Sequence, residues 1–349
     1  MNNNLQKYTI NQNASLIEAL KKMSEIPDTL NLFVLNDQEE LIGTLTDGDV
    51  RRGLINGLNV NSKLIDFIFR DFQYIKAGNF DKKIITIIRK KNIKIVPILD
   101  NNNQIIKLLN FKKIKSLIPA DAVLMAGGEG LRLRPLTEKT PKPLLKIGGK
   151  AIIEYNIDRL QQFGIQNQFI SINYLGEQII SFCKHKESDI NFKFIRETKP
   201  LGTIGSVKLV EHFENDYILI MNSDLLTNIN FEDFYDSFVS KNADMIVAAI
   251  PYKVDLPYAI FETEDRNILS FKEKPSYTYY ANAGIYLIKK ELINLIPSDE
   301  IFNATDFMQA VINKGLQVVH YPIRSYWLDI GNPDDFEKAQ RDVSHIDFD

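Results

Sequence analysis

The sequence of 349 residues has one cysteine, Cys183, and four histidines. A single cysteine excludes a disulfide framework and a cysteine-ligated metal site, so Cys183 is expected to be a small core residue on a helix. The histidines show no metal-ligand spacing, and no Ser-His-Asp or Cys-His arrangement is apparent. The sequence therefore argues against a covalent nucleophile of these kinds and against a cysteine or histidine metal site.

Long apolar runs are also missing. No stretch approaches the roughly 20 apolar residues that span a bilayer, and the start, Met1-Asn2-Asn3-Asn4, has neither the basic nor the apolar region of a signal peptide. We expect a cytoplasmic protein without a membrane partner. The net charge of −3 divides into +6 for residues 1–118 and −9 for the remainder, which argues against nucleic acid binding by the whole chain but leaves an anionic ligand open for the N-terminal part.

The sequence does contain a glycine-rich, basic stretch at residues 122–143, AVLMAGGEGLRLRPLTEKTPKP. The apolar run at 122–125 predicts a central strand buried on both faces. The glycines that follow allow backbone N–H groups to approach a phosphate chain. Four cations come next: Arg132, Arg134, Lys139 and Lys142. Together these features predict a polyphosphate-binding loop.

Two familiar glycine motifs are excluded, because the stretch fits neither the P-loop G-x-x-x-x-G-K-[ST] nor the dinucleotide pattern G-x-G-x-x-G. The pattern G-G-x-G-x-R-L-x-P-x-T-x-x-x-P-K-P instead resembles the signature of sugar-1-phosphate nucleotidyltransferases. The resemblance implies that Arg132 holds the β,γ-phosphates of an NTP and that Lys142 sits at its α-phosphate. It also implies a set of nucleotide-binding residues in this strand and loop: Leu124, Ala126, Gly127, Gly128 and Gly130.

The segment 197–206, ETKPLGTIGS, is similar to the second nucleotide loop of that family. Gly202 permits close backbone approach, and Glu197 stands where the family places its base-reading residue. Thr203 is expected to contact the nucleotide, although it could equally be the N-cap of an ordinary helix.

Two aspartates have the context of metal ligands. Asp224 follows the apolar strand 217–221, where a carboxylate suits a metal better than a core, and Mg²⁺ prefers such hard oxygen ligands together with phosphate oxygens and water. Asp224 resembles the first metal ligand of the family, and Asp329, in a W-x-D-x-G context, resembles the second. Mg²⁺ is therefore the expected cofactor.

A sugar-phosphate site is implied by two further blocks. The family's E-K-P element corresponds to Glu273 and Lys274, and its N-x-G strand corresponds to Asn282 and Gly284. The implied reaction is attack by a sugar 1-phosphate on the α-phosphorus of an NTP, giving an NDP-sugar and pyrophosphate. A nucleotide-sensing protein with an inactive transferase domain is the alternative from another class, and the intact set of cations and aspartates argues against it.

Glu197 also bears on the nucleobase. An ionised carboxylate can only accept hydrogen bonds, and guanine presents two adjacent donors, N1–H and its exocyclic amine. Uracil and thymine present one donor beside acceptors, and cytosine presents an unprotonated N3 beside its amine. We predict GTP and a GDP-sugar product, as in the CBS-fused guanylyltransferases of bacterial surface-glycan pathways that the chain resembles. UTP, CTP and dTTP remain the alternatives, because backbone groups at 124–127 can also read the base.

Residues 1–118 contain two copies of one β-α-β plan, at about 1–62 and 63–118, and resemble a tandem CBS module. The first copy has the family's ligand-binding element in Thr46 and Asp49, with Arg51 beside it, whereas the second has Asn110-Phe111-Lys112 in its place. A regulatory nucleotide at the first copy and a module that only packs domains or subunits are both open. Asp49 could equally be a carboxylate at the N-terminus of a helix, where it interacts favourably with the helix dipole.

The remainder, 119–349, alternates strands and helices, which predicts an α/β fold with a Rossmann-like, doubly wound, mostly parallel sheet. In such sheets ligands bind at the carboxyl ends of the strands, and each motif is expected to fall there. A homo-oligomer is expected because CBS modules often pair between subunits.

Overall fold

The computed structural model describes residues 3–26, 30–77, 82–188 and 190–348. The chain divides into two compact units, Met1–Leu117 and Ile118–Asp349, next to the boundary that the sequence predicts. Within the described residues, no helix combines the length and hydrophobicity needed to span a bilayer.

The N-terminal unit begins with a small three-stranded sheet and the helices around it. Strand β1 runs parallel to β2, and β2 runs antiparallel to β3. Helix α2 begins at a capping box between Ser15 and Glu18, and α3 begins at a second one between Thr46 and Asp49. The elements are α1 (Asn3–Tyr8), β1 (Thr9–Asn11), α2 (Leu16–Ser24), β2 (Asn31–Leu35), β3 (Leu41–Thr46), α3 (Asp47–Ile55) and the 3₁₀ turn η1 (Leu64–Asp66).

The second repeat contains β4 (Ile75–Lys76), α4 (Lys82–Lys90), β5 (Ile95–Leu99) and β6 (Ile105–Asn110), with the same strand directions as the first. The sequence of the second repeat predicts a helix from Asp81 to Lys91, and Asp81 lies outside the described residues. The sequence of the second repeat also predicts a short basic helix that ends at Leu117. This prediction is wrong, since residues 111–117 form a turn followed by irregular structure. Asn110 caps one turn by accepting from the Lys112 N–H at 3.0 Å, but lysines then occupy the end of the would-be helix where its dipole favours acidic side chains.

The two repeats share a core within the N-terminal unit. Phe33 and Leu41 of the first repeat cluster with Ile95 and Leu99 of the second. The Leu41 N–H donates to the Asn103 carbonyl at 3.0 Å, which joins the two sheets edge to edge.

The C-terminal unit is built on a seven-stranded sheet of order β11-β10-β7-β12-β17-β14-β18. Neighbouring strands are parallel except at β17, which is antiparallel to both β12 and β14. The prediction of a mostly parallel, doubly wound sheet is confirmed. The strands are β7 (Ala120–Met125), β10 (Asn167–Ile172), β11 (Asn191–Arg196), β12 (Tyr217–Asn222), β14 (Met245–Asp255), β17 (Ser276–Lys289) and β18 (Val318–Pro322).

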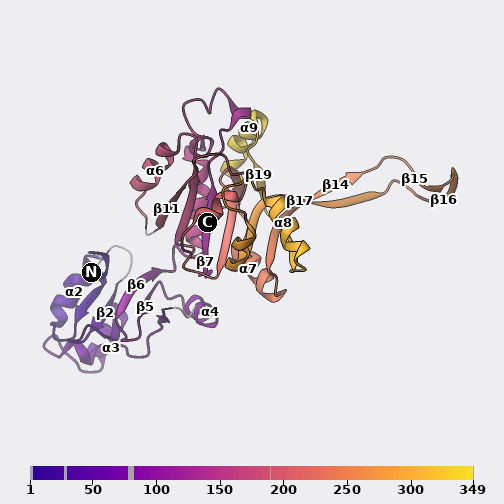
Figure 1. Cartoon of the computed structure of the whole chain (residues 1–349). Coiled ribbons are helices and arrows are strands. Elements are labelled where there is room, and N and C mark those ends of the chain that lie inside the picture. Colours follow the sequence, from indigo (N-terminus) through magenta and orange to yellow (C-terminus); the bar gives the residue numbers. More distant parts are fainter. Residues whose placement is uncertain (1–2, 27–29, 78–81, 189, 349) are drawn as a thin grey trace. The chain divides into compact units, whose positions relative to one another are not determined.

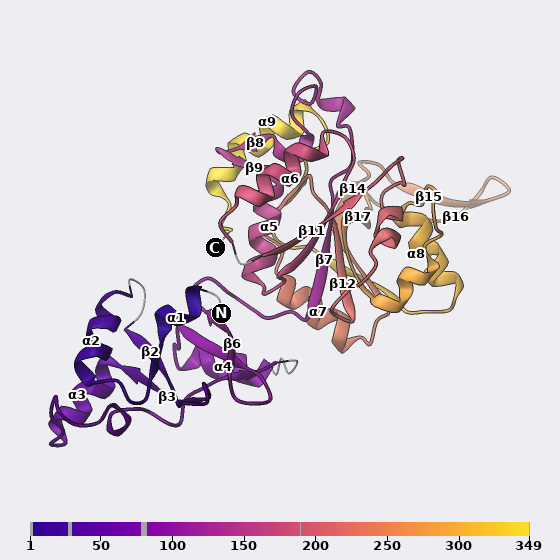
Figure 2. The same ribbon diagram turned by 60° about the vertical axis from the view of Figure 1, so that its left-hand side comes forward.

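Helices cover both faces of this sheet (Figure 2). One layer comprises α5 (Ile152–Gln162), α6 (Gly176–His185) and α7 (Phe231–Ser240), whose apolar sides pack on β7, β10 and β12. The other comprises α8 (Ala304–Asn313) with the 3₁₀ segments η4 (Gly205–Leu209) and η5 (Lys290–Leu295). Cys183 is buried on α6, as predicted. The remaining elements are η2 (Leu131–Leu133), η3 (Lys142–Leu144), β8 (Lys146–Ile147), β9 (Lys150–Ala151), β13 (Leu225–Thr227), β19 (Trp327–Asp329), α9 (Pro333–Asp342) and η6 (Val343–His345).

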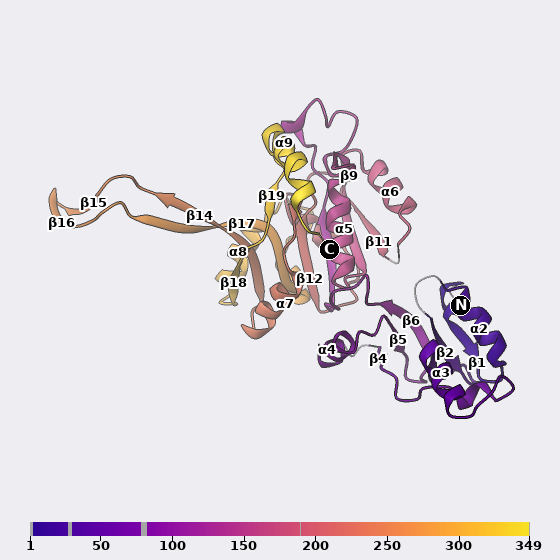
Figure 3. The same cartoon turned by 180° about the vertical axis from the view of Figure 1, so that it is seen from behind.

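Strands β14 and β17 continue beyond the sheet as a two-stranded arm, residues 251–281, which projects away from the body of this unit (Figures 1 and 3). Their ladder runs from Ala249 opposite Asn282 to Asp255 opposite Ser276. The Leu256 N–H then donates to the Pro275 carbonyl at 3.0 Å, and β15 (Ile260–Glu264) pairs with β16 (Asn267–Lys272) at the tip. The sequence reading did not foresee this arm.

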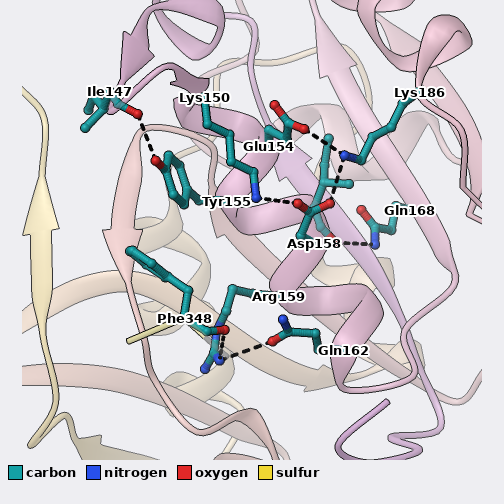
Figure 4. A network of polar contacts seen from close by, with 11 residues as sticks. Ile147, Lys150, Glu154, Tyr155, Asp158, Arg159, Gln162, Gln168, Lys186 and Phe348 are labelled. Atoms are coloured by element: carbon teal, nitrogen blue, oxygen red, sulfur yellow. Dashed lines mark hydrogen bonds and ion pairs between the residues drawn. The ribbon is translucent and has the colours of Figure 1, made fainter. Parts of the chain in front are cut away.

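Hydrogen bonds and ion pairs connect helix α5 to neighbouring segments of the same unit (Figure 4). The buried Arg159 guanidinium donates to the carbonyls of Ile229, at 2.5 Å, and Phe348, at 3.2 Å. Burial lowers the pKa of Arg159 to about 10, against the opposing influence of Asp347. Lys186 reaches Glu154 and Asp158 of the same helix, at 2.9 Å each. These contacts tie α6, the segment before α7 and the C-terminal segment to one helix.

We predict that Arg159→Met lowers the free energy of unfolding of this unit by about 2–4 kcal/mol, because two carbonyls lose a charged donor in a buried site. Arg341→Met is the control: this arginine is exposed and lies 3.9 Å from Glu337, so a change of under about 0.5 kcal/mol is expected. Urea unfolding followed by the fluorescence of the single tryptophan, Trp327, measures both. Equal effects of the two substitutions would contradict the role given to Arg159.

Candidate active site

A cavity of about 630 Å³ lies where β7, β10 and β12 end, and the glycine-rich loop forms one of its walls. Its lining includes most of the residues that the sequence predicts for the nucleotide, and one of the two predicted metal ligands, Asp224. The lining residues predicted for the nucleotide are Ala126, Gly127, Gly128, Gly130, Arg132, Lys142, Glu197, Gly202 and Thr203. Leu124 is fully buried inside β7 and is not part of the lining. Its side chain is therefore not available to contact a ligand in the cavity.

Two glycines of this wall have different structural reasons for being glycine. Gly202 has φ of +81°, and a Cβ there would stand 2.6 Å from the Phe302 carbonyl oxygen, which also accepts from the Ile204 and Gly205 N–H groups. A Cβ on Gly128 would meet no described atom within 4 Å. The space beside Gly128 is therefore part of the cavity.

We predict that Gly202→Ala lowers the stability of the unit by about 1–3 kcal/mol through backbone strain and also raises the KM for the nucleotide. Gly128→Ala should leave the melting temperature unchanged and raise only the KM, because its methyl group would occupy ligand space. Thermal melts and nucleotide titrations of the two variants separate these effects. A large loss of stability in Gly128→Ala would contradict the assignment of that space to a ligand.

Asp224 and Asp329, far apart in the sequence, lie side by side because β13 and β19 pair. Leu225 is opposite Asp329 in this short antiparallel ladder, and the Ile330 N–H donates to the Asp224 carbonyl at 3.1 Å. On the other side, the Asn156 side chain of α5 donates to the carbonyls of Ser223, at 3.2 Å, and Leu225, at 3.0 Å. The backbone on both sides of Asp224 is therefore fixed.

Nearby cations only partly balance the negative charges of Asp224 and Asp329. Lys142 from η3 forms an ion pair with Oδ2 of Asp224. Burial and the Asp224 carboxylate raise the pKa of Asp329, while Lys142 and Arg132 act in the opposite direction. The Oδ1 atoms of both aspartates are buried without a hydrogen-bond partner among the described residues.

Two buried, unpartnered carboxylate oxygens side by side fit a hard divalent cation. Mg²⁺ is commonly held by one or two carboxylates, with substrate phosphates and water completing its shell. A site supplied entirely by the protein is not seen, since the described residues contain no group of three or more His, Cys, Asp or Glu side chains arranged for a metal. The donor set suits an ion that binds together with a phosphate ligand.

Arg132 lies in η2 and approaches Gly331, which follows β19. A Cβ on Gly331 would stand 3.3 Å from an Arg132 Nη atom, so this glycine leaves room for the guanidinium. The Gly331 N–H donates to Asp335 at 3.2 Å, which fixes the turn. The W-x-D-x-G segment therefore supplies an aspartate and also shapes the position of a cation.

Glu197 lines the cavity beside Gly127 of the glycine-rich loop. A Cβ on Gly127 would come within 2.9 Å of Glu197 Oε1. Ser171 donates its hydroxyl to Oε1, and the Leu201 N–H donates to Oε2 at 3.2 Å. These two bonds orient the carboxylate and leave each oxygen a further lone pair for a ligand.

The predicted sugar-phosphate residues are not brought together. Gly284 lies near the cavity, because a Cβ there would stand 2.7 Å from the side-chain nitrogen of the lining residue Asn222, and the Gly284 N–H donates to Asn282 at 3.0 Å. Glu273 and Lys274 are exposed on the arm, outside the lining. The expectation that every motif falls at the edge of the sheet where the parallel strands end is wrong for Glu273 and Lys274, because the arm carries them away from it. Strand β17 runs antiparallel to β12 and brings Gly284 to that edge beside Asn222.

Several lining residues were not predicted, among them Asn173, Asn222, Ser223 and Gly331. Asn173 and Asn222 each stand where a parallel strand ends, at the edge of the sheet where ligands bind. A polar residue after an apolar strand was the signal that could have identified them.

In the N-terminal unit, Thr46 and Asp49 form hydrogen bonds with each other. Asp49 Oδ2 accepts from the Thr46 N–H at 2.8 Å and from its hydroxyl at 2.5 Å, and Oδ1 accepts from Arg52 at 2.5 Å. Arg51 is exposed and pairs with Asp47 at 2.6 Å. Asp49 therefore caps the start of α3, and its cationic partner is Arg52.

Comparison with known proteins shows the family. Residues 121–345 match the family model described as nucleotidyl transferase. The chain belongs to the nucleotidyl transferase family. Residues 1–56 match the CBS domain, so the nucleotidyltransferase unit follows a CBS-type unit, as the sequence motifs indicate.

Relatives of the nucleotidyltransferase unit include named guanylyltransferases. A D-glycero-α-D-manno-heptose 1-phosphate guanylyltransferase of Aneurinibacillus thermoaerophilus is 30% identical over 230 residues, covering 64% of this chain and 99% of the relative. A mannose-1-phosphate guanyltransferase of Saccharomyces cerevisiae is 30% identical over 226 residues, covering 61% of this chain, and the chain spans 62% of the yeast protein's length. A Bacillus anthracis protein solved with a sucrose has a TM-score of 0.53 at 24% identity, covering 66% of this chain and 97% of that one, and shows the fold alone.

Proposed function

We propose that the chain transfers GMP from GTP to a sugar 1-phosphate and releases pyrophosphate. The observation that carries the proposal is one cavity lined by the glycine loop, Lys142, Asp224 and Glu197. It combines a phosphate cradle, a metal-competent carboxylate and an acceptor suited to guanine. The names of the relatives described above support the same activity.

In this reaction, an oxygen of the sugar 1-phosphate forms a bond to the α-phosphorus of GTP, and the bond from that phosphorus to the bridging oxygen of the β-phosphate breaks. The electron pair leaves with pyrophosphate. The nucleophile is already anionic, so no protein base is required, and positioning and charge stabilisation supply the catalysis.

The chain's own cations would act on the phosphates. Lys142, held at the cavity by Asp224, is placed to exchange its carboxylate partner for the α-phosphate, where charge grows in the transition state. Arg132, beside Gly331, would hold the departing phosphates. Mg²⁺ held by Asp224 and Asp329 would, when bound, supply Lewis-acid charge that offsets the repulsion between the two substrates.

Fewer structural contacts support the proposed site for the sugar 1-phosphate. Gly284 lies next to Asn222 of the cavity wall, and Asn282 accepts a hydrogen bond from the Gly284 N–H; both residues would contact the sugar phosphate. Glu273 and Lys274 lie outside the cavity lining, so a contact between them and the sugar phosphate would require the arm to approach the cavity. We further propose a cytoplasmic, homo-oligomeric enzyme that supplies a GDP-sugar for surface glycans, with regulation by a nucleotide at the CBS-type unit.

Pyrophosphate release from GTP with a panel of sugar 1-phosphates, including mannose 1-phosphate and heptose 1-phosphates, tests the proposal. We expect release that depends on one class of sugar phosphate and on Mg²⁺, with omission of the sugar phosphate as the control. A protein that binds GTP but releases no pyrophosphate with any member of the panel would favour the inactive, nucleotide-sensing alternative.

A further inference from the structure

Glu197, which is proposed to read the base, has a hydrogen-bond donor from outside the cavity lining. Glu197 follows β11, and its N–H donates to the Ile172 carbonyl of the adjacent parallel strand β10 at 3.0 Å. Ser171 precedes Ile172 on β10 and donates its hydroxyl to Oε1 of Glu197. Ser171 is fully buried and is not among the residues that line the cavity. Its hydroxyl can therefore influence a ligand only through another residue.

A hydroxyl at this position of β10 has no packing reason. Residues 168–172 of the strand are all buried, and the neighbours of Ser171 along the chain are Ile170 and Ile172. Burying a hydroxyl costs free energy unless it forms a hydrogen bond, whereas an apolar side chain carries no such requirement. The hydroxyl of Ser171 meets the requirement through Glu197. The contact with Glu197 is therefore the feature that distinguishes a serine here from an apolar residue.

The backbone of Ser171 also holds the start of the glycine-rich loop. Its carbonyl accepts a hydrogen bond at 3.0 Å from the N–H of Ala126, the first residue after β7. The next residue, Gly127, lies so close to Glu197 that a Cβ on it would stand 2.9 Å from Oε1. Ser171 thus contacts the carboxylate through its side chain and the phosphate loop through its backbone.

Two donors define the orientation of the Glu197 carboxylate. Oε1 accepts from the Ser171 hydroxyl, and Oε2 accepts from the Leu201 N–H at 3.2 Å. The terminal torsion of a glutamate has a broad distribution, so the side chain does not fix this orientation by itself. One donor on each oxygen fixes it, whereas a single donor leaves the carboxylate free to turn about the remaining contact. A bidentate contact with a base requires both oxygens in one orientation.

We propose that Ser171 is a positioning residue for base selection, whose hydroxyl holds the Glu197 carboxylate in the orientation that accepts two donors of the base. This inference rests on the proposed function and assigns a role in it to a residue that touches no substrate. Because the carboxylate is oriented before the nucleotide binds, less freedom is lost on binding. Loss of the hydroxyl should therefore weaken the binding of GTP more than that of a nucleotide whose base offers one donor.

Equilibrium binding of GTP and of UTP to the full chain, without sugar phosphate, tests this role independently of turnover. Ser171→Ala should raise the dissociation constant for GTP about tenfold, because the carboxylate loses a donor that charged groups bind strongly. The dissociation constant for UTP should rise less, since uracil presents one donor beside acceptors.

Thr227→Val is the matched control. It removes another buried hydroxyl of the same unit, which donates to the Tyr326 carbonyl at 2.8 Å. This substitution should lower the melting temperature through the loss of that bond but leave the ratio of the GTP and UTP dissociation constants unchanged. A change in the ratio with Ser171→Ala alone would show that the effect does not arise from general destabilisation.

A double-mutant cycle with Glu197→Ala separates positioning from packing. If Ser171 acts through the carboxylate, Ser171→Ala should alter the GTP dissociation constant by less than about twofold when Glu197→Ala is already present. Effects that multiply in the double variant, or an unchanged GTP affinity in Ser171→Ala itself, would overturn the proposal. A preference of the unchanged chain for a pyrimidine nucleotide would instead contradict the proposed base. The same cycle measured with the preferred nucleotide would then still decide the role of Ser171.

Discussion

Replacing Asp224 with alanine is expected to lower turnover by about 10²–10³-fold or more, because in the proposed reaction this carboxylate would hold the metal beside the reacting phosphates. Asp329→Asn should have a comparable effect on activity. Pyrophosphate release with saturating Mg²⁺ measures both. Asp216→Ala is the matched control, since this aspartate is exposed just before β12 and pairs with Lys290 at 3.2 Å. Turnover of Asp224→Ala within a fewfold of the unchanged enzyme would contradict the metal assignment.

The same pair allows a test that does not depend on activity. The Asp329 side chain is partly buried, and its burial and the nearby Asp224 carboxylate raise its pKa, so its ionised form is less favourable in the folded chain than in the unfolded chain. The resulting cost is fully present above the raised pKa and disappears as the pH falls through it. Asp329→Asn should therefore melt at a higher temperature than the unchanged protein at neutral pH without ligands.

This gain in melting temperature should shrink as the solution is acidified towards the ordinary pKa of an aspartate. Mg²⁺ together with GTP should stabilise the unchanged protein more than Asp329→Asn. If Asp329→Asn were less stable at neutral pH, the carboxylate would be a structural group and its proposed role as a ligand would fail.

Glu197→Gln is expected to erode a preference for GTP. The carboxylate can accept from N1–H and from the exocyclic amine of guanine together, and a matched bidentate contact of this kind discriminates by about 1–3 kcal/mol, or about 5- to 150-fold in kcat/KM. An amide would present a donor to one of these two donors. Comparing kcat/KM for GTP, UTP, CTP and dTTP in both proteins measures the change.

Glu177→Gln is the control for this substitution, because Glu177 is exposed on α6 and pairs with Arg196 rather than lining the cavity. It should leave the nucleotide ranking unaltered. A preference for a pyrimidine nucleotide in the unchanged enzyme would show that Glu197 does not select guanine. The proposal for the reaction class would survive that result, but the GTP assignment would not.

The phosphate loop could be read from the sequence because its parts are contiguous. The apolar strand, the glycines and the cations lie within residues 122–143, and their relation depends on local backbone geometry alone. The capping boxes of α2 and α3 are local in the same sense. The predicted helix before Leu117 shows the limit: Asn110 caps one turn there, but lysines stand where the helix dipole favours acidic side chains.

The relation between distant segments was decided by tertiary packing. The pairing of β13 with β19 places Asp329 beside Asp224, and the contact of Gly331 with Arg132 depends on the same pairing. The antiparallel insertion of β17 and its extension into the arm remove Glu273 and Lys274 from the cavity. Strand direction and order follow from which buried faces fit together across the sheet. How the buried faces fit together is a property of the folded chain. Residue spacing along the sequence determines only which helices and strands form.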